Sequence, residues 1–120
     1  MAIREMSEFE LGWVAGLLEA EGAFYPAEFK TPKYGPYRYG RVSVVLTDLD
    51  VLERLRALTG VGNIAGPVVR ENPNHKPIWQ WKVSKNKESI TLMRAVYPWM
   101  GERRRARIDE VLALVEKGRG

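Results

Sequence analysis

The alternation of hydrophobic and polar residues divides the chain into segments of helical or strand period, separated by turn residues. Ser7 and Glu10 have the spacing of a capping box, so a first helix is expected over residues 8–21, ended by Gly22 at its C′ position. Three further helices are expected: one between Thr47 or Asp48 and Gly60, one from a cap at Ser84 or Asn86 to Tyr97, and one over residues 101–117.

Strand patterns lie between these helices, over residues 23–30, 37–47, 64–70 and 78–83. Pro26 interrupts the first pattern, which predicts an edge strand or a bulge. In the last pattern Trp79 and Trp81 alternate with polar residues, which favours packing in the core over stacking on a ligand. The resulting order, αββαββα with one further helix, indicates an α+β fold.

The first helix carries small residues at every fourth position, at Gly12, Gly16 and Ala20, so they share one face. Glycine inside a helix costs about 1 kcal/mol relative to alanine, so the two glycines indicate a close approach of other backbone. Two explanations remain open from spacing alone. The face admits a neighbouring strand of this chain, or it admits a helix of another molecule.

Composition narrows the class of protein. The chain of 120 residues has a net charge of +4, and we expect one domain over residues 1–120. It contains no cysteine, no apolar run long enough for a membrane span and no secretory signal. We therefore expect an intracellular protein without a membrane partner. The basic excess favours a polyanionic partner, although many basic proteins bind none.

Residues 14–22, Val-Ala-Gly-Leu-Leu-Glu-Ala-Glu-Gly, resemble the nine-residue motif of the LAGLIDADG homing endonucleases. The flanking Trp13 and Phe24 and the order of the elements also fit this family. The resemblance implies the αββαββα LAGLIDADG homing endonuclease fold. In this fold a four-stranded, antiparallel, saddle-shaped sheet carries its helices on one face.

The resemblance also implies an activity and partners. A chain with one motif pairs as a homodimer through the face of Gly12, Gly16 and Ala20. The dimer hydrolyses both strands of a long pseudo-palindromic site in double-stranded DNA and leaves short 3′ overhangs. Such domains are usually encoded by mobile introns, so we expect action in the cytoplasm of a prokaryote or in an organelle, with no small-molecule substrate. The alternative is a non-cleaving DNA- or RNA-binding module of the same fold, such as a maturase or regulator.

The same resemblance assigns a metal site. Glu21 stands at the metal-binding eighth position of the motif, beside Ala20, whereas Glu19 stands at the structural sixth position. Paired helices would bring two copies of Glu21 together, and divalent cations would relieve their repulsion. The implied cofactor is Mg²⁺, with Mn²⁺ as a substitute and Ca²⁺ supporting binding without cleavage.

Two further catalytic residues are expected. The resemblance places a basic residue near the scissile phosphate, and Arg103 is the best match within the arginine run 103–107, with Arg104 and Arg107 as neighbours. The alternative is that these arginines form an ordinary solvent-exposed face of the helix. The resemblance places a polar residue that orders the attacking water at Leu46 or Thr47; the Leu46 side chain has no polar atom, so Thr47 is expected, with Asp48 as a further candidate.

Polar and aromatic residues alternate with core residues along the strands and form a candidate DNA interface, because a two-stranded ribbon fits the major groove. The expected contacts are Tyr25, Lys30, Lys33, Tyr37, Tyr39, Arg41, Ser43, Arg70, Gln80 and Lys82. Arg41 and Gln80 are candidates for reading bases, and the lysines and Arg70 for binding phosphates or bases. An ordinary solvated sheet face is the alternative. His75 is expected to be a loop residue and not a catalytic base.

Overall fold

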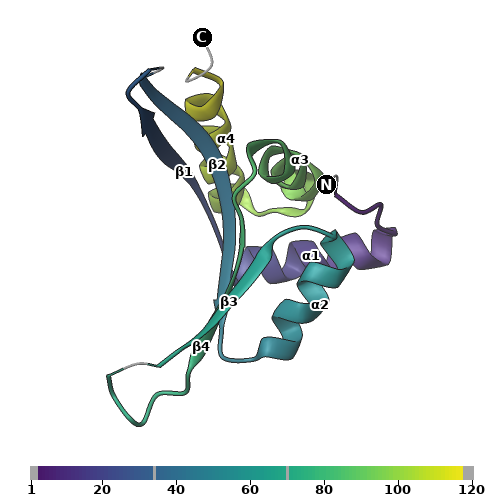
Figure 1. Cartoon of the computed structure of the whole chain (residues 1–120). Coiled ribbons are helices and arrows are strands. Elements are labelled where there is room, and N and C mark those ends of the chain that lie inside the picture. Colours follow the sequence, from purple (N-terminus) through teal and green to yellow (C-terminus); the bar gives the residue numbers. More distant parts are fainter. Residues whose placement is uncertain (1–2, 34, 70, 118–120) are drawn as a thin grey trace.

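The computed structural model describes residues 3–33, 35–69 and 71–117. Its elements follow the expected order (Figure 1). They are α1 (Glu8–Glu21), β1 (Gly22–Thr31), β2 (Gly35–Leu46), α2 (Leu49–Thr59), β3 (Asn63–Val68), β4 (Ile78–Val83), α3 (Asn86–Val96), the 3₁₀ turn η1 (Tyr97–Trp99) and α4 (Glu102–Lys117). None of the described helices is long and apolar enough to cross a membrane.

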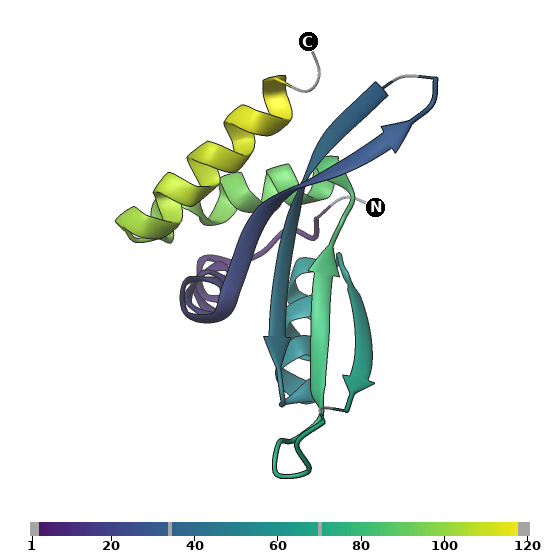
Figure 2. The same ribbon diagram turned by 90° about the vertical axis from the view of Figure 1, so that its left-hand side faces the viewer.

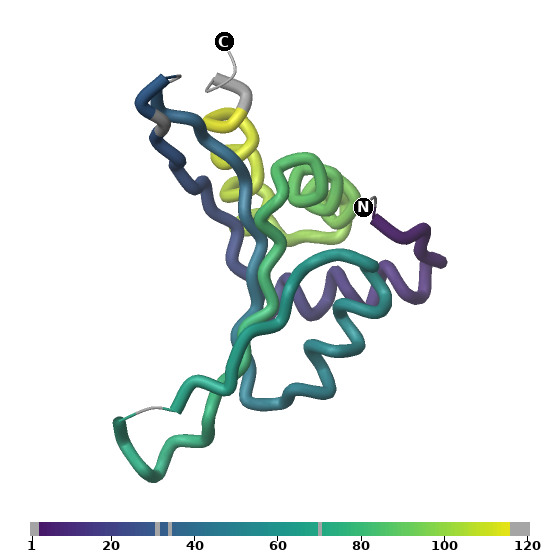
Figure 3. Tube along the Cα trace, viewed as in Figure 1, coloured from purple at the N-terminus to yellow at the C-terminus, as the bar shows by residue number. Residues whose placement is uncertain are grey.

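The four strands form one antiparallel sheet in the order β1-β2-β4-β3. All four helices lie on one face of this sheet, and the other face carries no helix (Figure 1). The sheet is long, curved and twisted (Figure 2). The β1–β2 and β3–β4 hairpins point to opposite ends of the molecule, where β1–β2 runs beside α4 and β3–β4 projects past α2 (Figure 3). The expected α+β fold is therefore confirmed.

The two hairpins differ in regularity. Pairing of β1 with β2 is continuous from Gly22 opposite Val44 to Thr31 opposite Gly35. The pairing continues through Pro26 without a bulge. Proline has no N–H group to donate, and an edge strand such as β1 tolerates this because one of its sides has no neighbouring strand. In β3 the register shifts between Ala65 and Val68, and the strand ends there, before the expected residue 70.

The core lies between the helices and the covered face of the sheet. Trp81 is its largest fully buried side chain, and its indole N–H donates a hydrogen bond to the Val61 carbonyl at 3.0 Å. Trp79 also packs against this core, so the expected inward alternation in β4 is confirmed. The strands and helices contribute Phe24, Val42, Val44, Leu18, Leu52, Leu55, Leu92 and Ile108, all buried.

Helix α1 begins and ends at the expected residues. The Ser7 hydroxyl accepts from the Glu10 amide at 3.1 Å, and the Ser7 amide donates to the Glu10 carboxylate at 3.0 Å. Gly22 follows the helix, but it is extended (φ −76°, ψ 150°) and not left-handed, as glycine commonly is after a helix. The chain turns directly into β1, and a Cβ on Gly22 would lie 2.6 Å from the Leu18 carbonyl oxygen. Close approach is therefore the reason for glycine here.

The caps of the later helices are also partly corrected. Gly60 ends α2 in the left-handed conformation (φ 72°), as expected. The N-cap of α3 is Lys85 and makes no side-chain cap bond, so the expected caps at Ser84 and Asn86 are wrong. The Asn86 side chain instead accepts from the Gly40 amide at 2.9 Å, because β4 ends before it reaches this part of β2.

Candidate active site and nucleic-acid interface

One face of α1 contacts nothing in the described chain. Gly12, Gly16 and Ala20 are exposed, and a Cβ added to either glycine would have no heavy atom within 4 Å. Approach of a strand of this chain, one of the two explanations open from the sequence, is therefore wrong within the described residues. Phe9, 88% exposed, precedes Gly12 by three positions and shares this side of the helix. We call Phe9, Gly12, Gly16 and Ala20 the bare face.

Phe9 was missed by the sequence reasoning. Its signal is a large apolar side chain between two acids in the first turn of α1, where nothing in the strand or helix patterns requires one. Its exposure is the largest among the exposed large hydrophobic residues of the described chain. An exposed aromatic at the end of a small-residue face is typical of a surface that another molecule covers.

Glu21 is the last residue of α1 and is exposed. Its carboxylate makes no hydrogen bond or ion pair with the residues that the structure describes. Within the same ranges no three His, Cys, Asp or Glu side chains gather into a metal cage. A free carboxylate suits Mg²⁺, but one chain supplies too few side-chain ligands, and Ala20 offers only its backbone carbonyl. Further oxygen ligands would have to come from a second chain, water or phosphate.

Glu19 occupies a different side of α1, because two residues along a helix are separated by about 200°. Its Oε2 is buried and has no hydrogen-bond partner among the described residues. Its Oε1 lies 2.8 Å from the position that a Cβ on Gly101 would take. Glu19 therefore packs against the start of α4, which fits its expected structural role.

The arginine run of α4 divides into residues with different partners. Arg104 donates from Nε to the Glu19 carbonyl at 3.1 Å and from Nη1 to the Gly22 carbonyl. Arg107 donates from Nε to the Phe24 carbonyl at 2.8 Å. Both arginines therefore bind the backbone where α1 passes into β1.

The other two arginines differ from these. Arg105 donates to the carbonyls of Tyr97 at 3.2 Å and Pro98 at 2.8 Å, and its guanidinium lies over the Tyr97 ring. Arg103 is exposed and has no hydrogen bond or ion pair with any described residue. Of the candidates for the basic catalytic residue, Arg103 is the one whose guanidinium is available to a ligand.

Thr47 lies at the same junction. Because Gly22 pairs with Val44, the end of β2 runs beside the end of α1, and Thr47 follows β2 directly. Its side chain is exposed, whereas Leu46 packs against the core. The end of α1 thus lies beside the end of β2, and the start of α4 reaches the end of α1 through Arg104.

The uncovered face of the sheet carries most of the expected DNA contacts. Tyr25 pairs with Arg41 and Ser43 with Lys82, so side chains from three strands share this face. Ser43 is only 5% exposed, because the flanking strands cover it, and its expected accessibility is wrong. Lys30 alternates onto the opposite face, because Pro26 makes no bulge, so its expected placement is also wrong. Arg70 lies outside the described residues.

Arg41 is held in place by a tyrosine. Its Nη2 donates to the Tyr39 hydroxyl, and its guanidinium carbon lies 5.0 Å from the Tyr39 ring centroid. The Tyr39 ring stacks on Tyr37 at 6.3 Å between centroids. The Arg41 Nε is buried and has no partner among the described residues. This arrangement orders Arg41 and leaves part of its donor set available to a ligand.

An apolar hollow of about 380 Å³ adjoins this tyrosine pair. Its lining residues are Phe29, Tyr37, Tyr39, Ser84, Lys85 and Asn86. Phe29, 56% exposed, was also missed by the sequence reasoning, and the signal was its parity with Tyr25 along an uninterrupted strand. The uncovered face thus combines aromatic and basic groups, the composition that nucleic-acid surfaces use.

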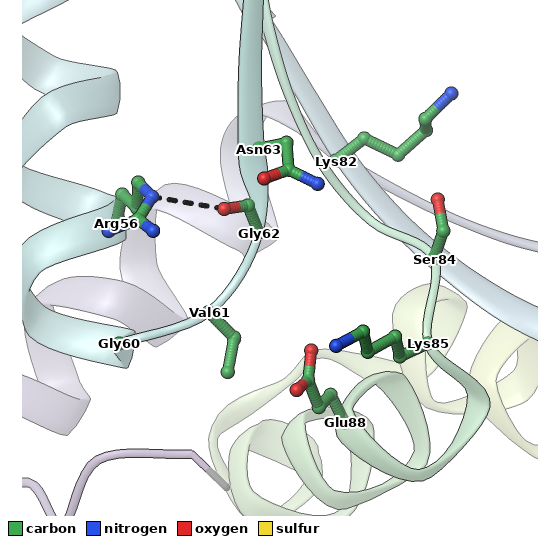
Figure 4. A pocket seen from close by; sticks show the side chains of 9 residues that line it. All are labelled: Arg56, Gly60, Val61, Gly62, Asn63, Lys82, Ser84, Lys85 and Glu88. Atoms are coloured by element: carbon green, nitrogen blue, oxygen red, sulfur yellow. Dashed lines mark hydrogen bonds between the residues drawn. The ribbon is translucent and has the colours of Figure 1, made fainter. Parts of the chain in front are cut away.

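A second hollow of about 120 Å³ lies between the end of α2, β3 and the start of α3, and it shares Ser84 and Lys85 with the first (Figure 4). None of the three cationic side chains that line it points into the hollow as a free anion ligand. Arg56 donates from Nε to the Gly62 carbonyl at 3.0 Å, Lys85 points toward Glu88, and Lys82 points away from the hollow. This hollow therefore does not resemble an anion site.

His75 lies in the exposed segment between β3 and β4, with its amide donating to the Asn72 carbonyl at 3.0 Å. This segment projects from the end of the sheet away from α1 (Figure 1). Its position fits the expected role as a loop residue.

Comparison with known proteins supports the fold. No protein-family model and no curated protein sequence matches the chain. Among solved structures, the homing endonuclease I-CvuI, in complex with the I-CreI target in the presence of Mg with the DNA not cleaved, superposes with a TM-score of 0.71 at 17% identity. This match covers 94% of the present chain and 69% of I-CvuI.

Two intron-encoded homing endonucleases, both complexed with DNA, are also similar. The group I intron-encoded I-CeuI gives a TM-score of 0.66 at 17% identity, covering 94% of this chain and 56% of I-CeuI. The archaeal I-Vdi141I gives 0.64 at 20% identity, covering 91% of this chain and 70% of I-Vdi141I. These neighbours are LAGLIDADG homing endonucleases, and the chain has their fold. The resemblance carried by residues 14–22 is thereby confirmed at the level of the fold.

Proposed function

We propose that this chain is a site-specific endonuclease for double-stranded DNA that acts as a homodimer. Two copies pair through their bare faces, and each lays its uncovered sheet face on one half of a pseudo-palindromic site. Both strands are hydrolysed with short 3′ overhangs. The 120-residue chain serves as one domain of this dimer. We place it inside the cell, acting on DNA in the cytoplasm of a prokaryote or in an organelle.

The observation that carries the proposal is the state of α1. Its two glycines face open space, although each costs the helix about 1 kcal/mol, and the helix ends in an exposed carboxylate without a partner in the described chain. A second copy on the bare face accounts for the glycines, and a metal ion accounts for the carboxylate. The fold shared with DNA-bound homing endonucleases supports the same reading.

In the proposed mechanism Glu21 of each copy would hold a divalent cation. A bound Mg²⁺ would supply Lewis-acid stabilisation and an activated water. The free guanidinium of Arg103 binds the scissile phosphate and stabilises the charge that develops on it. The Thr47 hydroxyl orients the attacking water, either by accepting a hydrogen bond from it or by donating one to it. Structures of I-CvuI with DNA in the presence of Mg and of Ca support a divalent cation here.

The uncovered sheet face is the proposed DNA surface. The twelve residues of β2 span roughly 40 Å at about 3.3 Å each, slightly more than one turn of duplex. Arg41, ordered on Tyr39, and Gln80 are the proposed base readers, while Lys82 and Lys33 bind phosphates. Tyr25, Tyr37 and Phe29 supply apolar contact, including contact with thymine methyl groups.

A non-cleaving DNA- or RNA-binding module is the second candidate. The observation that favours it is Leu46, which packs against the core where the fold would offer a polar residue for the attacking water. Thr47 and Asp48, the next two residues, are exposed and are the candidates to replace it. Cleavage by the wild-type chain decides between the two candidates.

Selection of cleaved sites from a random duplex library in Mg²⁺ tests the proposal and identifies the target. With the selected duplex, Glu21→Gln is expected to lower the cleavage rate at least about 100-fold, because the metal loses its ligand, while binding in Ca²⁺ persists. Glu53→Gln, an exposed acid on α2, is the matched control and is expected to cut normally. Normal cutting by Glu21→Gln would refute the catalytic assignment. Binding without cleavage by the wild type would favour the non-cleaving module.

A further inference from the structure

We propose that Arg104 is a positioning residue that fixes the carboxyl end of α1 and, through it, the direction of the Glu21 carboxylate. This inference rests on the proposed function of Glu21. It assigns a role to a second arginine of the run 103–107, distinct from that of Arg103.

The end of α1 is electrostatically unfavourable by itself. The last four carbonyls of a helix have no partner within it, and their dipoles sum to a partial negative charge. The last turn of α1 contains Glu19 and Glu21 and no basic residue. The Gly22 amide donates to the Leu18 carbonyl, which satisfies only the first of the four. Without help from elsewhere, this end would fray and Glu21 would have no defined direction.

Arg104 supplies that help from α4. Its Nε–H group binds the Glu19 carbonyl in the last turn of α1, and its Nη1–H group binds the Gly22 carbonyl in the first residue of β1. The two acceptors lie on either side of Glu21 in the chain. Because a guanidinium is planar and rigid, two bonds from one fork fix both carbonyls relative to each other. The backbone of Glu21 is thereby held between two fixed points.

Two further contacts join α4 to the junction of α1 and β1. The Glu19 carboxyl group packs against Gly101 at the start of α4, in a space that a Cβ on Gly101 would fill. One turn further along α4, Arg107 donates to the Phe24 carbonyl of β1. The first two turns of α4 therefore hold both sides of the α1–β1 junction, and Arg104 is at the centre of this contact.

The geometry also separates Arg104 from catalysis. Its Nε and Nη1 are both used on backbone carbonyls, and its side chain is partly buried. Arg103, the neighbouring residue, has no such contact in the described chain and is exposed. In a dimer two Glu21 carboxylates would repel each other, and a rigid backbone is needed to keep both on one metal site. Arg104 provides that rigidity.

The test compares Arg104→Gln and Arg104→Lys with Arg105→Gln. Arg105 is a matched control, because it also donates to two backbone carbonyls from the same helix, but at η1. Arg104→Gln is expected to raise the Mg²⁺ concentration for half-maximal cleavage about tenfold, the usual effect of losing a residue behind a metal ligand, with KM for DNA unchanged. Arg105→Gln is expected to change neither. Arg104→Lys keeps the charge but not the fork, and is expected to resemble Arg104→Gln.

A second measurement is independent of cleavage. Backbone amide order parameters from NMR are expected to fall at residues 19–23 in Arg104→Gln, from the rigid range near about 0.85 to below about 0.6, and to stay unchanged there in Arg105→Gln. If the wild type cuts no duplex, the proposed function fails, and these order parameters still decide the role of Arg104. Unchanged order parameters in Arg104→Gln would overturn the inference. An equal shift of the Mg²⁺ dependence in Arg104→Gln and Arg105→Gln, or wild-type behaviour of Arg104→Lys, would also overturn it.

Discussion

Two groups of glycines occupy opposite environments in this molecule. At Gly12 and Gly16 on the bare face, an added Cβ would meet nothing within 4 Å. At Gly62, which has a φ of +94°, it would collide with the Trp81 indole nitrogen, and at Gly40 it would lie 2.8 Å from the Met93 methyl carbon. The packing of the chain itself requires the inner glycines. The outer glycines cost helix stability and make no contact in the described chain, which supports the proposed contact with a second molecule.

The largest expected effect is at the inner position. Gly62→Val introduces a branched side chain at positive φ and against Trp81, so we expect the free energy of unfolding to fall by about 2–5 kcal/mol. Urea unfolding followed by tryptophan fluorescence measures this change. Gly12→Ala is the control and is expected to raise the stability of the single chain by up to about 1 kcal/mol. Similar losses in both variants would remove the distinction between the two groups.

At the outer position the expected effect is on assembly. Gly16→Leu has room within one chain, so the fold is expected to remain, while the added side chain prevents close pairing and leaves a monomer. Sedimentation equilibrium measures the association, with Ala57→Leu on the exposed side of α2 as the control. A stable Gly16→Leu dimer would show that the bare face is not the interface.

Phe9 refines the same comparison. If the bare face pairs, burial of this side chain contributes about 1.5–3 kcal/mol per copy, so the loss from both copies in Phe9→Ser is expected to raise the dimer dissociation constant at least about 100-fold. Phe29→Ser removes an exposed phenylalanine from the sheet face instead and is expected to leave dimerisation unchanged. The two variants are compared by the same sedimentation experiment. Equal effects would indicate non-specific association of exposed aromatics.

The smallest expected effect is at the start of α1. The Ser7 amide, and after it Arg4, hold the pKa of Glu10 below its ordinary value of 4.5. The unfolded chain therefore binds this proton more readily, and the stabilisation present above pH 4.5 is lost as the pH falls through the lowered pKa. Urea unfolding between pH 7 and pH 3 is expected to show a shallower acid loss in Glu10→Gln than in Glu8→Gln. Identical profiles would mean that the capping box adds no pH dependence.

Local patterns predicted most of the fold, because they depend on residues close in sequence. The capping box, the bounds of β4 and the end of α2 at Gly60 were all correct for this reason. Errors arose where a distant residue intervened. Asn86 does not cap α3, because its side chain accepts a hydrogen bond from the Gly40 amide.

In the candidate site, too, features that depend on nearby residues were predicted better than those that depend on distant ones. The resemblance of residues 14–22 to the family motif singled out Glu21 and the bare face, and the structure shows both exposed; their roles as metal ligand and pairing surface stay predictions. The arginine run could not be resolved from its sequence, because four similar side chains differ only in the backbone that each one reaches. Arg41 could be placed on a face by alternation, but only the structure shows that its guanidinium binds the Tyr39 hydroxyl and lies over the Tyr39 ring.

By itself the sequence determined the order of the elements, the small-residue helix with its terminal acid, and the excess of positive charge, because periodicity and composition are local properties. Only the tertiary structure decided that the helix glycines face open space, that Ser43 is covered, and that Arg104 joins α4 to the end of α1. These contacts join residues up to 85 positions apart. Such contacts are set by how the layers pack, and no short segment of the chain encodes that packing.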